Sequence, residues 1–221
     1  MTLTYLGHSA FYLVSGDWKV LIDPFLSGNP RSPKSVVDFP ELSHILVTHG
    51  HHDHIGDTVQ LARQTGALVV CNYELGHYFR GLGLEHVHTM HLGGRFEFLK
   101  MTPALHGSSI EIDGMLYDGG NPAGFLIEHD GKKIYHAGDT GLMMDMMLLK
   151  EERIDVALLP IGSNYTMDWQ DALRAIAMIE PKKVIPMHYN TFDAIQVDTS
   201  SLPLPPDVTI LFLAPGESIE V

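Results

Sequence analysis

Residues 45–54 read ILVTHGHHDH, an apolar run that passes directly into four histidines and one aspartate. The run predicts a buried β-strand, and the polar residues after it predict a loop that leads into a helix. Such a loop can turn several side chains toward one point. Imidazole nitrogens and a carboxylate oxygen together suit zinc, manganese, iron or nickel. The segment therefore predicts a metal site that includes His49, His51, Asp53 and His54.

Three further candidate ligands each stand at or just beyond the end of another apolar β-run. They are His106, Asp139 and His188. Strand ends on one edge of a sandwich meet in space, so residues far apart in the sequence can assemble into one site. The recurrence at three strand ends predicts that these side chains join the histidine cluster.

The rest of the chain predicts strands interspersed with helix-length segments. We expect two sheets packed face to face and covered by helices, an α/β sandwich. Because no repeat, low-complexity tract or linker interrupts the pattern, residues 1–221 are expected to form one domain. Strands are predicted at 3–6, 10–14, 18–22, 45–48, 68–71, 89–105, 124–128, 133–136, 156–160 and 183–186, and helices at 58–64, 73–80, 142–151 and 169–179.

Three connecting features carry expectations of their own. Residues 209–213 and 218–221 are expected to close the fold as a β-pair. The loop 23–38 is rich in Pro, Ser and Gly, and a loop of that length in a compact domain is expected to lie beside the site. Gly66 and Gly81 are expected to end the two helices before them.

The charge balance restricts the partners. Fourteen Lys and Arg against 27 Asp and Glu leave a formal charge of -13, which disfavours nucleic acid and anionic membranes. A small anionic substrate remains open, because two bound divalent cations would make a pocket locally positive. We expect a small-molecule substrate, no nucleic acid and no membrane. A homo-oligomer is left open, since four methionines crowd residues 143–147.

The compartment is predicted from cysteine use and from the first residues. Cys71 is the single cysteine, so no internal disulfide can form. The sequence MTLTYLGHSAF at the start lacks the pattern of a secretory signal, and no apolar run approaches the roughly 18 residues of a membrane span. A cytoplasmic protein is expected.

In order and spacing, these ligand candidates resemble the signature of the metallo-β-lactamase superfamily. The resemblance covers essentially the whole chain and implies a four-layer αββα sandwich. Further stretches look like the small bacterial and archaeal "metal-dependent hydrolase" branch related to L-ascorbate-6-phosphate lactonase. These stretches are LGHS at 6–9, DPF at 23–25, HGSS at 106–109, HAGDTG at 136–141 and PMHYNT at 186–191.

The resemblance implies a division of the ligands between two divalent metal ions. One ion would take His49, His51 and His106, the other Asp53, His54 and His188, with Asp139 bridging both. Zinc is favoured, with manganese, nickel and iron as alternatives. The implied protein is a binuclear, lactonase-like hydrolase in which metal-bound hydroxide attacks a small ester, lactone or phosphorylated metabolite.

Four residues are expected to act on the substrate. Asp53 is the catalytic candidate, because its carboxylate could orient the nucleophile or return a proton to the leaving group. His8 is placed by the resemblance near the mouth of the site, as a substrate contact or as a support for a ligand. Tyr189 and Asn190 directly follow His188 and could donate to a developing oxyanion, or could instead cap that loop. His52 is expected to point outward.

Alternative functions predict features that the sequence lacks. A phosphodiesterase or nuclease of the same fold would need a basic surface, against the balance of -13. A di-iron redox protein tends to carry Glu in place of the second histidine of the motif, where this chain has His51. A non-catalytic metal-binding protein would need a damaged ligand set. β-Lactam hydrolysis is disfavoured, because the usual cysteine ligand position is not occupied and Cys71 lies on a predicted strand far from the cluster.

Overall fold

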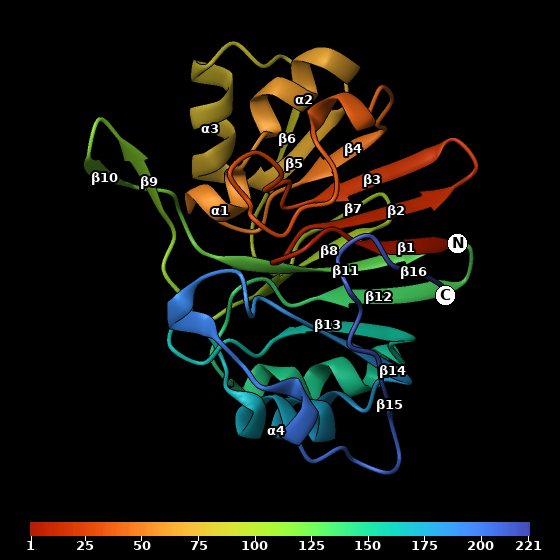
Figure 1. Ribbon diagram of the computed structural model, residues 1–221. Coiled ribbons are helices and arrows are strands. Elements are labelled where there is room, and N and C mark those ends of the chain that lie inside the picture. Colours follow the sequence, from red (N-terminus) through yellow and green to blue (C-terminus); the bar gives the residue numbers. More distant parts are fainter.

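Two seven-stranded sheets lie face to face in the computed structural model, which describes residues 1–221 (Figure 1). Helices cover the outer face of each sheet, so the order of layers is helix, sheet, sheet, helix. This is the four-layer αββα sandwich that the sequence predicted.

The first sheet combines antiparallel and parallel pairing. Its strands β16, β1, β2 and β3 pair antiparallel, and β3 to β6 pair parallel. In sheet order the strands are β16 (Ser218–Glu220), β1 (Thr2–Tyr5), β2 (Phe11–Ser15), β3 (Trp18–Ile22), β4 (His44–Leu46), β5 (Leu68–Asn72) and β6 (Val87–Met90).

The second sheet has the same mixture. Strands β12 to β15 run parallel, while β7, β8, β11 and β12 pair antiparallel. In sheet order the strands are β15 (Thr209–Ile210), β14 (Lys183–Met187), β13 (Val156–Pro160), β12 (Lys132–His136), β11 (Ala123–His129), β8 (Leu99–Pro103) and β7 (Arg95–Phe96).

Side chains point alternately to the two faces of each strand, so one part of the core lies between the two sheets and another lies between the first sheet and its helices. On β2, Phe11 and Leu13 face the second sheet, whereas Tyr12 between them packs with the helices, as the two-residue period of a strand requires. Strand β13 is buried along its whole length, because the parallel strands of the second sheet are covered on both faces.

The helices begin and end where local chemistry satisfies their free backbone groups. The Asn72 side chain accepts from Leu75 N at the start of α3, and Asp168 accepts from Asp171 N at the start of α4. Gly66 ends α2 in the left-handed conformation, with φ 74°. The helical elements are α1 (His52–Ile55), α2 (Thr58–Thr65), α3 (Tyr73–Gly81), α4 (Trp169–Ile179) and the 3₁₀ segments η1 (Val36–Asp38), η2 (Met144–Glu152), η3 (Asp193–Ile195) and η4 (Thr199–Ser201).

Two predictions about elements were wrong. The C-terminal strands β15 and β16 do not pair with each other, because β15 joins the edge of the second sheet and β16 the edge of the first. The expected α-helix at 142–151 is the 3₁₀ segment η2. The prediction that α3 ends at Gly81 is confirmed, with Gly81 as its last residue.

A hairpin outside both sheets was not predicted. Strands β9 (Ser109–Ile112) and β10 (Met115–Asp118) form a separate antiparallel pair that projects from the sandwich (Figure 1). Its base is held by the Asn72 amide, which donates to Gly119 O at 2.7 Å and to Asn121 O at 2.9 Å. None of the helices has the length and apolarity needed to span a lipid bilayer.

Candidate metal centre

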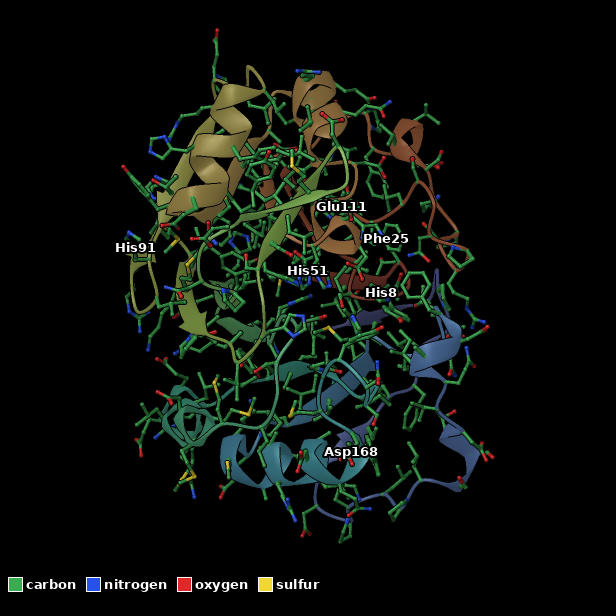
Figure 2. All side chains as sticks on the ribbon, turned by 90° about the vertical axis from the view of Figure 1, so that its left-hand side faces the viewer. His8, Phe25, His51, His91, Glu111 and Asp168 are labelled. Atoms are coloured by element: carbon green, nitrogen blue, oxygen red, sulfur yellow. The ribbon has the colours of Figure 1, made fainter.

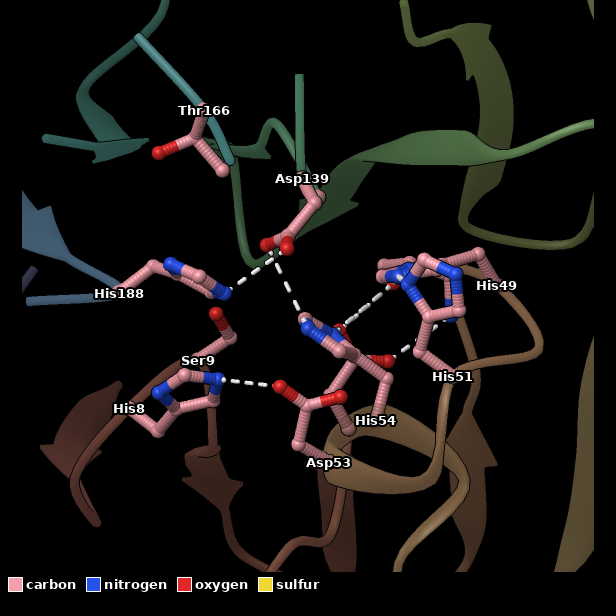
Figure 3. A network of polar contacts seen from close by, with 12 residues as sticks. His8, Ser9, His49, His51, Asp53, His54, Asp139, Thr166 and His188 are labelled. Atoms are coloured by element: carbon pink, nitrogen blue, oxygen red, sulfur yellow. Dashed lines mark hydrogen bonds and ion pairs between the residues drawn. The ribbon is translucent and has the colours of Figure 1, made fainter. Parts of the chain in front are cut away.

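All seven predicted metal ligands come together at one edge of the sandwich. Figure 3 labels these residues apart from His106. They are supplied by short α1 and by segments that follow strands β4, β8, β12 and β14. Each of these strands carries its ligand to the same edge, which is why residues as distant as His49 and His188 can face one space.

The first group contains three histidines. Their ring nitrogens lie within 4.8 Å of one another in the set His49, His51 and His106. The Nε2 atom of His49 is 2.9 Å from Nδ1 of His51. His49 is fully buried, whereas the other two rings are partly open to solvent. One ion could therefore be reached from the outside while its innermost ligand stays fixed.

The second group lies beside the first. Its ligand atoms, also within 4.8 Å of one another, belong to His8, Asp53, His54 and His188. The sequence predicted three of these four as ligands and placed the fourth, His8, near the substrate.

Asp139 stands between the two groups. Its Oδ2 is 2.8 Å from Nε2 of His188 and its Oδ1 is 3.4 Å from Nε2 of His54 (Figure 3). The same Oδ2 is 3.6 Å from Nε2 of His106. A single carboxylate thus contacts imidazoles of both groups. This is the position that a bridging ligand needs.

Unpaired buried atoms indicate that the cluster fits metal ions. His54 Nε2 and Asp139 Oδ1 are buried and face each other without forming a hydrogen bond. Buried polar atoms without partners are unfavourable, and in native proteins they are rare. A cation between them would satisfy both. Nitrogen and carboxylate oxygen donors in this number are those of zinc and related transition metals.

The charge state of the cluster supports the same conclusion. Burial raises the pKa of Asp139, but the imidazoles of His188 and His54 outweigh burial and hold that pKa well below its usual range. Burial lowers the pKa of His54, while the carboxylates of Asp139 and Asp23 raise it well above its ordinary value. Burial lowers the pKa of His49 well below its ordinary value. The buried Asp139 carboxylate therefore stays ionised and draws positive charge onto His54, the compensation that a bound metal cation would supply instead.

Asp23 holds His54 from behind and was missed as a site residue. Its Oδ2 is 2.7 Å from Nδ1 of His54, and the backbone and hydroxyl of Thr48 donate to the same carboxylate at 2.8 and 2.7 Å. Because Nδ1 of His54 is engaged, Nε2 is turned toward Asp139. The available signal was the Asp23-Pro24-Phe25 step at the end of β3, an acid directly after a buried strand.

His8 lies behind Asp53 rather than at the mouth of the site. It is fully buried, with Nε2 3.0 Å from Asp53 Oδ2 and Nδ1 2.9 Å from Thr191 Oγ1 (Figure 3). Burial lowers the pKa of His8 to about 4. The neutral ring donates one hydrogen bond to the carboxylate and accepts one from the hydroxyl. Of the two roles predicted for His8, this geometry favours support of a ligand.

The structure does not bring Tyr189 and Asn190 to the pocket. The Asn190 amide donates to Val197 O at 3.0 Å and accepts from Val197 N at 2.6 Å, so it closes its own loop. The Tyr189 ring packs near Phe212, with centroids 6.4 Å apart. These contacts favour the alternative considered for both residues, which is closure of their own loop. Their role toward substrate stays a prediction.

A pocket of about 430 Å³ opens over the cluster. His51, Asp53, His106, Asp139 and His188 form its floor, and segments outside the predicted site form its walls. The His52 side chain is 78% exposed and points outward at the rim, as expected. Figure 2 shows this side of the molecule, with Glu111 on the hairpin and His51 in the cluster.

Comparison with known proteins gives a consistent result. A family model described as "Beta-lactamase superfamily domain" matches residues 19–189. A "UPF0173 metal-dependent hydrolase" of Alkaliphilus metalliredigens is 55% identical over 205 residues, 91% of each chain. A protein of the same name from Methanosarcina mazei is 44% identical and spans 100% of this chain and 99% of its own.

Solved structures agree. Igni18, a novel metallo hydrolase from the archaeon Ignicoccus hospitalis, superposes with a TM-score of 0.86 at 35% identity, over 99% of this chain and 97% of its own. An isothiocyanate hydrolase from gut bacteria of Delia radicum shares the fold, with a TM-score of 0.76 at 20% identity over 100% of this chain and 99% of its own.

Proposed function

This chain belongs to the β-lactamase superfamily as a metal-dependent hydrolase, and from that premise we propose that it holds two divalent ions and hydrolyses a small ester, lactone or phosphorylated metabolite. The observation that carries the proposal is the contact of Asp139 with imidazoles of both ligand groups. One ion would be held by His49, His51 and His106, the other by Asp53, His54 and His188, and Asp139 would serve both.

The bound metal would supply the electrophilic part of the chemistry. Two divalent ions polarise a carbonyl or phosphoryl oxygen and bring the pKa of water toward neutrality. All the donor atoms are imidazole nitrogens or carboxylate oxygens, a set that favours zinc and that would also accommodate manganese, nickel or iron.

The chain's own residues orient the reacting water, fix the ligands and exclude bulk water from the inner side of the cluster. Asp53 Oδ2 is bonded to His8, so Oδ1 is the oxygen that would both hold the ion and orient water in the pocket or carry a proton to the leaving group. His54 and Asp139 are almost fully buried, which keeps bulk water from the inner side of the cluster. Asp23 and Thr48 fix His54 and leave the reacting space to the outer ligands.

Nucleic acid is not favoured as the substrate. Every residue that lines the pocket is acidic, neutral or a histidine, and none is Lys or Arg, whereas a nuclease would place cations along the phosphate backbone. We propose a small-molecule substrate and a single functional unit over residues 1–221. The cytoplasmic location stays a prediction from the lone Cys71.

Elemental analysis of the purified protein tests the two-ion proposal. After reconstitution and removal of excess metal, we expect about two equivalents of a transition metal per chain. Asp139→Ala should lose most of both and His106→Ala about half. His77→Ala, at an exposed histidine outside the cluster, is the control and should keep the full content. One equivalent in the wild type, or two in Asp139→Ala, would overturn the proposal.

A further inference from the structure

Three exposed apolar side chains gather at the mouth of the pocket. Leu116 of β10, Tyr165 after β13 and Phe192 after β14 line it and are 71%, 59% and 37% exposed. Scattered exposed apolar residues are ordinary, but residues from three separate segments that gather around one concave site mark a binding surface. These three side chains are called the apolar mouth below.

The segments that carry the apolar mouth are held in place. Met167 N donates to Thr140 O at 3.0 Å, which ties the segment of Tyr165 to the neighbour of Asp139. Asn190 closes the loop that carries Phe192. Gly50 N donates to Ser108 Oγ at 3.0 Å and joins the base of the hairpin to the ligand loop. The mouth is therefore a formed surface beside the reacting groups.

The charge at the mouth is negative. Glu111 lines the pocket on the hairpin, and the lining contains no Lys or Arg. A negative group on the distant part of a substrate would lose hydration without meeting a Lys or Arg side chain, and it would face the Glu111 carboxylate. The metal ions could compensate only the group that reacts.

From these observations, and resting on the proposed hydrolase function, we infer that the substrate is an ester or lactone whose part beyond the reacting bond is apolar and uncharged. That part packs on Leu116, Tyr165 and Phe192. The pocket of about 430 Å³ lies within the range of small-molecule sites. A metabolite that carries a phosphate away from the bond to be hydrolysed is excluded.

Two esters of equal length test the inference in the metal-loaded full-length protein. The p-nitrophenyl ester of hexanoate and the mono-p-nitrophenyl ester of adipate share a leaving group and a six-carbon acyl chain, and adipate adds a terminal carboxylate. We expect kcat/KM for the hexanoate ester to exceed that for the adipate ester by about 10-fold or more. It should also exceed kcat/KM for p-nitrophenyl acetate by about 10-fold or more. Equal rates, or a preference for the adipate, would overturn the inference and leave the proposed function intact.

Variants of the mouth locate the effect. Leu116→Ser should lower the ratio of kcat/KM for the hexanoate ester to kcat/KM for the acetate ester about 3-fold to 10-fold. Glu111→Lys should raise the ratio of kcat/KM for the adipate ester to that for the hexanoate ester by a similar factor. Leu148→Ser and Glu151→Lys are matched controls on η2. Leu148 is 72% exposed, against 71% for Leu116, and neither control lines this pocket. A Leu116→Ser protein that keeps the ratio and changes its elution in gel filtration would instead make the mouth a contact between chains, and would overturn the inference.

Binding separates this inference from the proposed chemistry. Hexananilide and the monoanilide of adipic acid, both resistant to hydrolysis, are compared by saturation-transfer NMR on the metal-loaded protein. Stronger binding of hexananilide without turnover of any ester, lactone or phosphoester would refute the proposed function and support the apolar mouth. Stronger binding of the adipic monoanilide, or binding of hexananilide that Leu116→Ser does not weaken, would overturn the inference.

Discussion

Asp23 and His54 form a fully buried pair in which the carboxylate Oδ2 lies 2.7 Å from Nδ1 of the imidazole. Asp23 stands behind the predicted ligand His54 and fixes which ring nitrogen of His54 faces the centre. We predict that Asp23→Asn lowers metal affinity about 10-fold to 100-fold, because the neutral amide holds the ring less firmly. Competition with a chromophoric chelator measures the change.

A matched acid serves as the control for Asp23. Asp38→Asn removes a carboxylate from the same loop, but Asp38 is exposed and contacts only its near neighbours Ser35 and Lys34. It should leave metal affinity unchanged. Equal losses in both variants would show that the loop, rather than the bond to His54, matters.

Gly138 precedes Asp139 and has no room for a side chain. Its φ is 63°, and a Cβ there would lie 2.3 Å from the backbone oxygen of Ala123. We predict that Gly138→Ala destabilises the protein by about 3 kcal/mol or more, because the backbone must shift. Gly131→Ala has a similar φ of 69° and open space around it, so it should cost only about 1 kcal/mol. Urea unfolding of both metal-free variants makes the comparison, and equal losses would contradict the steric explanation.

Asp155 contributes stability that depends on pH. Burial raises the pKa of Asp155, but its bonds from Lys182 Nζ at 2.7 Å and Lys133 N at 2.9 Å outweigh burial and lower it below its ordinary value. A carboxylate whose pKa is lower in the folded state stabilises the fold above its unfolded pKa of about 4, and that stability is lost as the pH falls through the folded value.

Replacement by asparagine isolates this contribution. The free energy of unfolding should be about 1.5 to 3 kcal/mol lower in Asp155→Asn than in the wild type at pH 7. The difference should shrink once the pH falls below about 4. A difference that stays constant from pH 7 to pH 3 would mean that packing, and not charge, is responsible.

The single thiol should be inert in the folded protein. Cys71 is fully buried on β5, and burial raises the pKa of its thiol to about 12. Because the thiolate is the reactive form, we predict no reaction with a disulfide reagent at pH 8 within an hour, and one thiol per chain after unfolding in guanidinium. Rapid labelling of the native protein would show that β5 opens readily.

Local patterns were sufficient where neighbours along the chain decide the structure. The hairpin of β2 and β3 and the bounds of α4 were predicted closely, because turn residues and helical periodicity are short-range signals. The convergence of the ligands was also predictable, since parallel strands deliver their ends to one edge. The contact of Asp139 with both groups followed from the resemblance rather than from spacing.

Long-range pairing was not predictable in the same way. Strands β15 and β16 are near neighbours in sequence, yet each completes a different sheet, a choice set by which edges are free. The hairpin of β9 and β10 did carry a local signal, Asp113-Gly114 between alternating residues, and it was overlooked. Its role at the pocket mouth depends on the anchoring by Asn72, which no local pattern reveals.

The pairing of β16 with β1 means that the outer edge of β1 stays unpaired until β16 has been synthesised. Thr2 lies opposite Glu220 and Leu3 opposite Ile219, so one of the earliest strands made waits for one of the last before its outer edge is covered (Figure 1). Contacts that distant in sequence form slowly, and an uncovered strand edge is prone to pair with other chains. Until β16 has been synthesised, the nascent protein therefore carries an uncovered edge on β1 that can pair with strands of other chains.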